Sequence, residues 1–203
     1  IFTALAVMQL HEQGRLALDQ PLGRYLSDLP ETWAELNAHQ LLSHQSGLPD
    51  LLNLWPHKRL DGLDFGAVLA HFRQSPALLF SPGTQAAYSN TNYMLLAHLV
   101  SQVSGLDFGE YLQRHVFEPA DMASSSVLDA WPRWVGQQAL PYAQEGKMHG
   151  IDYALMGAIG QKGSMRDLEQ FMQALWQHKL VQAKTLDLMM RPHAEFADGK
   201  RYG

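Results

Sequence analysis

The pattern of hydrophobic and polar positions begins with a segment that is apolar on nearly every side. Residues 1–13 hold few polar side chains, and their apolar positions are Ile1, Phe2, Ala4, Leu5, Ala6, Val7, Met8 and Leu10. A helix of this kind is normally buried deep in a domain. Gly14 is the expected stop, because helices commonly end before a glycine.

The rest of the chain predicts further helices bounded by start and stop signals. Asn37 and Asp64 are expected N-caps, and Ser164 with Asp167 forms an S-x-x-D capping signature. Pro82-Gly83 predicts a type II turn. The predicted helices are 38–44, 65–74, 91–104 with a stop at Gly105, 107–116, a segment after Ser164 with apolar residues from Leu168 to Trp176, and 183–190.

Strand patterns are scarce in this chain. Residues 127–155 read as irregular, and only 135–143 suggests a strand or one arm of a hairpin. The glycine-rich 157–164 is interpreted as a turn that passes close to another backbone before a helix. No repeat, low-complexity tract or linker divides the chain, so the sequence predicts one mostly helical segment.

Composition narrows the function classes. The chain has 203 residues, 46% of them hydrophobic, and a formal net charge of −5, which disfavours a nucleic-acid surface. It has no cysteine, so disulfides and thiolate chemistry are excluded. No apolar run reaches the roughly 18 residues of a membrane span.

Metal, cofactor and phosphate motifs are also missing from the sequence. The ten histidines show neither H-E-x-x-H nor a tight cluster with acidic residues, so no metal site or cofactor is predicted. Phosphate-cradling glycine motifs and the G-x-S-x-G elbow are absent. No serine lies three residues before a lysine, and Lys184-Thr185 is followed by Leu186, so S-x-x-K and K-[ST]-G do not occur.

The stretch Tyr-Ser-Asn-Thr-Asn that begins at Tyr88 allows two interpretations. In the first, the Ser, Asn and Thr side chains cap the next helix, each worth about 1 kcal/mol, and Tyr88 is only a partly buried ring. In the second, Tyr88 and Asn90 face one cleft, because residues two apart in an extended segment point the same way. A phenol beside an ammonium can relay protons, and the amide can donate to a substrate carbonyl.

Several segments, in order, resemble the serine β-lactamase-like superfamily, above all its class C β-lactamase, D-alanyl-D-alanine carboxypeptidase and esterase group. They are FTALAVMQLHEQGRLALDQPLGRYL, HQLLSHQSGLPD, SPGTQAAYSNTNYMLLAHLVSQVSG, YLQRHVFEPADM and GSMRDLEQFMQAL. The third is similar to the family element that holds the Tyr-x-Asn motif. The resemblance implies that Tyr88 is the catalytic tyrosine and Asn90 the substrate-binding asparagine.

The resemblance also implies a fold and a reaction. The fold is α+β, of β-lactamase/transpeptidase type, and the present residues would form its mostly α-helical part with few sheet strands. The reaction is acyl transfer from a β-lactam, a D-alanyl peptide or a small ester to the serine of S-x-x-K. The family is usually exported in bacteria, which implies a periplasmic or secreted location. Residues that depart from the family pattern are Gln45 for Thr, Asp121 for Gly and the GQKGS turn for a Gly-Gly element.

By this alignment the chain begins about one residue after the lysine of S-x-x-K and stops before the strand with the third motif. We therefore expect residues 1–203 to be a single domain, incomplete at both ends and inactive alone. Two alternatives stay open: a catalytically inactive binding or sensing domain of the same fold, and a plain helical interaction domain. The substrate, the oligomeric state and the state of S-x-x-K are not fixed by this sequence.

Overall fold

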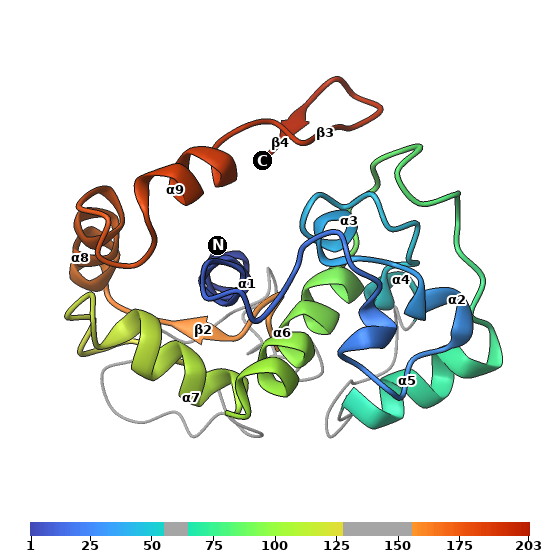
Figure 1. Cartoon of the computed structure of the whole chain (residues 1–203), viewed down its shortest axis with the longest axis horizontal. Helices are drawn as coiled ribbons and strands as arrows, with labels where there is room; N and C mark the ends of the chain where they lie inside the picture. The colour runs from blue at the N-terminus through green and yellow to red at the C-terminus, as the bar shows by residue number, and fades with distance from the viewer. Residues whose placement is uncertain (55–64, 128–155) are drawn as a thin grey trace, which may run out of the picture.

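The computed structural model describes residues 1–54, 65–127 and 156–203 of the chain. The predicted cap at Asp64 and the predicted strand at 135–143 lie outside these residues. Within them, the expected mostly helical architecture with few strands is confirmed (Figure 1).

The first helix, α1 (Phe2–Glu12), is the centre of the molecule. Figure 1 shows it end-on, with α6 (Asn90–Ser104) and α7 (Phe108–Leu112) on one side and α8 (Met165–Trp176) and α9 (Ala183–Met189) on others. Its side chains from Leu5 to Leu10 are buried, as the apolar pattern predicts. The Phe2 ring packs edge-on against Phe117 and Phe171, at centroid distances of 5.6 and 4.8 Å, and so joins α1 to two other helices.

A second group of short helices lies beside α6 (Figure 1). These are η1 (Leu22–Arg24), α2 (Glu31–Ala34), α3 (Ala38–Leu42), α4 (Leu51–Leu54) and α5 (Phe65–Gln74). The predicted cap of α3 is confirmed, because Asn37 and Gln40 form a reciprocal capping box. Trp33 packs on Phe72 at 4.7 Å and so joins α2 to α5.

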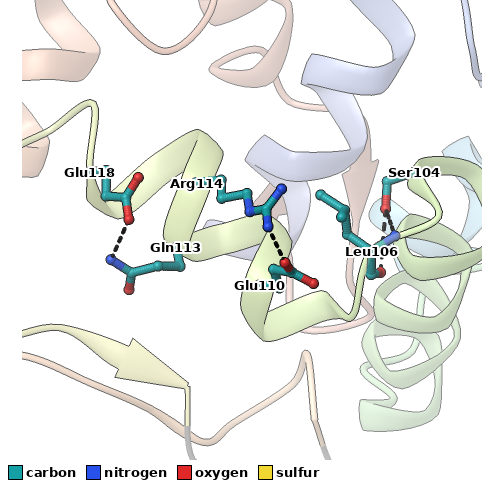
Figure 2. Close-up of polar contacts among 6 residues, drawn as sticks. All are labelled: Ser104, Leu106, Glu110, Gln113, Arg114 and Glu118. Carbon is teal, nitrogen blue, oxygen red and sulfur yellow. Dashed lines mark hydrogen bonds and ion pairs between the residues drawn. The ribbon is translucent and has the colours of Figure 1, made fainter.

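The helix predicted over 107–116 changes type part-way. After α7 it continues as a π-helix, η2 (Gln113–Phe117). Figure 2 shows its exposed polar contacts: Arg114 pairs with Glu110, and Gln113 donates to Glu118. Such exposed pairs add little stability, so the buried residues Tyr111, Leu112, Val116 and Phe117 hold this segment in place. Asp121, where the family has Gly, follows with a φ of 58°.

The described strands are only two residues long. Strand β1 (Ser126–Val127) pairs antiparallel with β2 (Gln161–Lys162), and β3 (Ala194–Glu195) with β4 (Arg201–Tyr202). Strand β2 lies inside the glycine-rich 157–164, where no strand was predicted. The predicted close approach is confirmed, because a Cβ at Gly157 would stand 2.4 Å from the Tyr93 carbonyl oxygen of α6. Ser164 caps α8 by accepting from the Asp167 N–H, as predicted.

Other predicted boundaries are confirmed within a few residues. Gly105 follows α6 in a left-handed conformation, and the Thr84 N–H bonds the Ser81 carbonyl across Pro82-Gly83. In the part of the chain that the structure describes, no helix is both long and apolar enough to cross a membrane.

Candidate active site

The first residues of α6 bring Tyr88 and Asn90 together. The Tyr88 hydroxyl donates to Asn90 Oδ1 over 3.3 Å. The Tyr88 side chain is 58% exposed, whereas Asn90, the first residue of the helix, is only 7% exposed. The hydrogen bond to the buried Asn90 amide gives the Tyr88 hydroxyl a defined direction. The two side chains are in contact, whereas a shared cleft and their roles in catalysis stay predictions.

The interpretation of the polar run as helix caps is wrong for its side chains. Ser89 occupies the N-cap position with an extended backbone, but its side chain makes no capping bond. Its hydroxyl donates instead to the Pro49 carbonyl, and so does the Thr91 hydroxyl, which also accepts from the Leu51 N–H. These polar side chains thus fasten the start of α6 to residues 49–51, which are distant in sequence.

The Asp50 carboxylate accepts from a backbone N–H at the start of α6, as the side chain of an N-cap residue would. Its Oδ1 accepts from the Asn90 backbone N–H at 3.3 Å, and its two oxygens lie 3.3 and 3.0 Å from Asn90 Nδ2. A negative charge at a helix N-terminus interacts favourably with the helix dipole. Asp50 therefore stabilises the start of α6 and also contacts the Asn90 side chain.

A buried histidine lies below the Tyr88 ring. Nδ1 of His44 is 3.2 Å from the Ser89 N–H donor and 3.1 Å from Asn92 Nδ2. Asn92 Oδ1 accepts from the Ser46 hydroxyl at 2.6 Å, which directs the amide nitrogen of Asn92 toward His44. Two donors at Nδ1 place the ring proton on Nε2, which is buried and has no hydrogen-bond partner among the described residues.

Burial and neighbouring rings set the protonation states of this cluster. Burial lowers the pKa of His44 from 6.5 to about 4, so its ring is neutral at physiological pH. Its ring centroid is 4.5 Å from that of Tyr88 and 4.9 Å from that of Tyr202. Partial burial, then Tyr202 and the Asp50 charge, raise the pKa of Tyr88 above its ordinary 10. In this arrangement Tyr88 is a protonated phenol, able to donate a proton.

Metal binding finds no support in this geometry. Across residues 1–54, 65–127 and 156–203 no group of three or more His, Asp or Glu side chains is placed to hold an ion.

Sequence reasoning did not single out His44 and Asp50 as parts of this site. Both belong to the segment SHQSGLPD, which was recognised only as a family element. One signal was present: a histidine and an aspartate flank a Ser-Gly-Leu-Pro turn directly after a short helix, where polar side chains are free to reach another element. Their partner could not be read from local sequence, because it lies about 40 residues away.

The helical architecture agrees with the fold that the resemblance to the serine β-lactamase-like proteins implies. The sequence profile of the Beta-lactamase family matches residues 1–203, and the chain belongs to that family. It is similar to penicillin-binding protein 4* of Bacillus subtilis, with 27% identity over 94% of this chain and 46% of that protein. It is also similar to the D-aminopeptidase of Brucella anthropi, with 32% identity over 55% of this chain and 22% of the relative.

Solved structures confirm the fold. The crystal structure of a penicillin-binding protein from Bacillus halodurans superposes with a TM-score of 0.83 and 30% identity, and it covers 100% of this chain and 64% of the other. The β-lactamase/transpeptidase-like fold is therefore shown. The chain spans about half the length of two Bacillus subtilis relatives that match more than nine-tenths of it.

Proposed function

We propose that this chain is part of a serine acyl hydrolase that works through an acyl-enzyme, with Tyr88 as its proton-transfer residue and Asn90 as a substrate-binding residue. The observation that carries the proposal is the hydrogen bond from the hydroxyl of Tyr88, an exposed residue, to the buried Asn90 amide at the start of α6. The nucleophile lies outside residues 1–203, because no serine in them precedes a lysine by three positions.

The proposed chemistry follows from the protonation state of Tyr88. When a serine oxygen attacks an acyl carbon, a base must take the serine proton and an acid must protonate the leaving group. The raised pKa keeps the Tyr88 phenol protonated, but it also makes this phenol a weaker acid than a group whose pKa is near the working pH. A lysine ammonium beside it would favour the phenolate and lower this pKa, so that the same group could also accept a proton.

The substrate in this proposal is a β-lactam, a D-alanyl peptide or a small ester, because all three present an acyl carbon to a nucleophile. Relatives that match the chain include a penicillin-binding protein and a D-aminopeptidase, which supports an acyl substrate without choosing among them. No cofactor is needed for such a reaction. The proposal includes export of the protein to the periplasm or the medium, and the support for this part is the family resemblance.

The test uses the natural protein that contains this chain, treated with a penicillin-type or a fluorophosphonate probe and followed by intact mass. We expect one covalent adduct, and Tyr88→Phe should slow its formation by roughly 10²- to 10⁴-fold, the usual worth of a general acid–base residue. Tyr111→Phe is a matched control, since the Tyr111 hydroxyl is buried and without a partner among the described residues.

The possible results separate the alternatives. No adduct on the natural protein with either probe would favour the inactive binding or sensing domain. An adduct formed at the same rate by the Tyr88→Phe protein would contradict the role of Tyr88. Residues 1–203 alone, with a mass of 22.8 kDa, should gain no adduct, and one found there would show that the nucleophile lies within them.

A further inference from the structure

We propose that Asp50 is a positioning residue of this site, which holds the Asn90 side-chain amide in the one orientation that turns its oxygen toward the Tyr88 hydroxyl. The consequence for catalysis rests on the proposed function. The orientation of the amide is a property of the chain itself and can be tested without any reaction.

The contacts on the two sides of the Asn90 amide are of opposite polarity. On one side its Nδ2 lies 3.0 and 3.3 Å from the two oxygens of Asp50. On the other side its Oδ1 lies 3.3 Å from the Tyr88 hydroxyl. An ionised carboxylate only accepts hydrogen bonds, so the amide nitrogen must face Asp50 and the amide oxygen is left for Tyr88. Rotation of the amide by 180° would bring two oxygens together at Asp50.

Asp50 is itself held in place by backbone groups. Its Oδ1 also accepts from the Leu52 N–H at 3.1 Å and from the Asn90 N–H at 3.3 Å. The preceding carbonyl, that of Pro49, accepts the Ser89 and Thr91 hydroxyls. A half-buried carboxylate with these partners has little freedom to rotate. It can therefore impose its orientation on Asn90.

The amide orientation decides which way the phenolic proton points. With Oδ1 facing it, Tyr88 donates its proton toward Asn90 until a substrate or another group competes for it. With Nδ2 facing it, Tyr88 would have to accept from the amide, and its own proton would point elsewhere. A proton-transfer group depends on such alignment, and small misplacements of catalytic groups have large effects on rate.

Asp50→Asn separates this role from a simple structural one. Asparagine can accept from the same backbone N–H groups as aspartate, so the start of α6 should lose only the small contribution of the Asp50 charge. If the side-chain oxygen of the introduced asparagine keeps the bonds to Leu52 and to the Asn90 N–H, its NH₂ group replaces the oxygen that now faces Asn90 Nδ2. Two NH₂ groups would then oppose each other, and the Asn90 amide should turn over. The Asn90 NH₂ group would then face Tyr88.

The experiment measures this reversal by NMR in the natural protein. In the wild type the Asn90 NH₂ protons should show no nuclear Overhauser contact with the Tyr88 ring, whereas the Asp50→Asn protein should show it. The rate of probe acylation should fall roughly 10- to 100-fold, while the probe concentration at half-maximal rate changes little and the melting temperature falls only slightly. Asp19→Asn, which removes an exposed carboxylate, should change neither readout.

The possible results lead to distinct conclusions. An unchanged Asn90 orientation in Asp50→Asn, or a reversed orientation with a normal acylation rate, overturns the proposal. If the wild-type protein is not acylated, the proposed function fails, and the NMR contact alone then decides whether Asp50 orients the amide. If Asp50→Asn does not fold, Asp50→Ser replaces it, and a fall in rate that merely follows melting temperature in both variants also overturns the proposal.

Discussion

At the scale of single residues, His44 has the least ordinary environment in the site. It follows α3 with a φ of 57°, in the left-handed region that is uncommon for residues other than glycine, although asparagine, aspartate and histidine adopt it more often than the rest. Its ring is fully buried, and its Nδ1 accepts from both Ser89 and Asn92. The His44 ring supports the segment that carries Tyr88, because its Nδ1 accepts hydrogen bonds from that segment. It can do so only while the ring is neutral.

This requirement predicts a pH dependence of stability. The folded state lowers the pKa of His44 to about 4, so the unfolded chain, with a pKa near 6.5, binds more protons between these values. The contribution of His44 is therefore fully present above pH 6.5 and is lost as the pH falls toward 4. At about 1.4 kcal/mol per pKa unit, the loss is roughly 3 kcal/mol. Urea unfolding at pH 7 and at pH 4.5 measures it.

The matched variants for this measurement are His44→Asn and His115→Gln. Asparagine tolerates the left-handed backbone and can still accept from Ser89, but it does not titrate, so the fall in stability below pH 6.5 should become smaller. Burial also lowers the pKa of His39 and of His98, so a weaker fall should remain. His115 is exposed, and its replacement should leave the pH profile as it is. An unchanged profile in His44→Asn would contradict this account.

At the scale of elements, the sequence predicted the helices whose positions depend on apolar periodicity and on capping residues. The apolar period of α8 and the caps Asn37 and Ser164 were enough to place helices within a few residues. The π-helical turn of η2 and the pairing of β1 with β2 were not predicted, because each depends on packing against elements distant in sequence. The same limit applies in the site, where capping propensity suggested bonds within α6 and the side chains bind Pro49 and Asp50 instead.

The glycine-rich segment before α8 gives a prediction at this scale. Gly157 has a φ of 95°, and an added Cβ would lie 2.4 Å from the Tyr93 carbonyl oxygen and 2.5 Å from Ala97 Cβ. Gly157→Ala should therefore strain both the backbone and the contact with α6, and should lower the free energy of unfolding by roughly 2–4 kcal/mol. Gly160→Ala is the control, because its φ is 96° but nothing lies within 4 Å of the added Cβ.

Urea unfolding of the two variants separates the steric effect from the conformational one. Gly160→Ala should cost only the left-handed backbone term, about 1–2 kcal/mol. An equal loss in both variants would mean that residues 157–164 move away from α6 without cost. The close approach would then not be needed for the fold.

At the scale of the whole molecule, an apolar cavity lies beside α1. Its volume is about 360 Å³, and its lining comes from elements far apart in the chain, among them Ile1, Met8, Leu42, Tyr93, Leu186, Met189 and Met190. In the view of Figure 1, α9 and the β3–β4 pair lie above α1. Ile1 and Met190 are also exposed, at 66% and 61%. Apolar surface of this kind favours association.

We therefore expect a polypeptide of residues 1–203, produced by itself, to bind a hydrophobic dye and to self-associate, as seen by fluorescence and sedimentation velocity. Met190→Lys should weaken both effects, because it places a charge at the mouth of the cavity. Gln102→Lys adds the same charge to an exposed position of α6 away from the cavity lining and should change neither. A monomeric polypeptide without dye binding would show that the cavity closes in solution. Equal effects of the two lysines would show that net charge, and not the apolar lining, controls association.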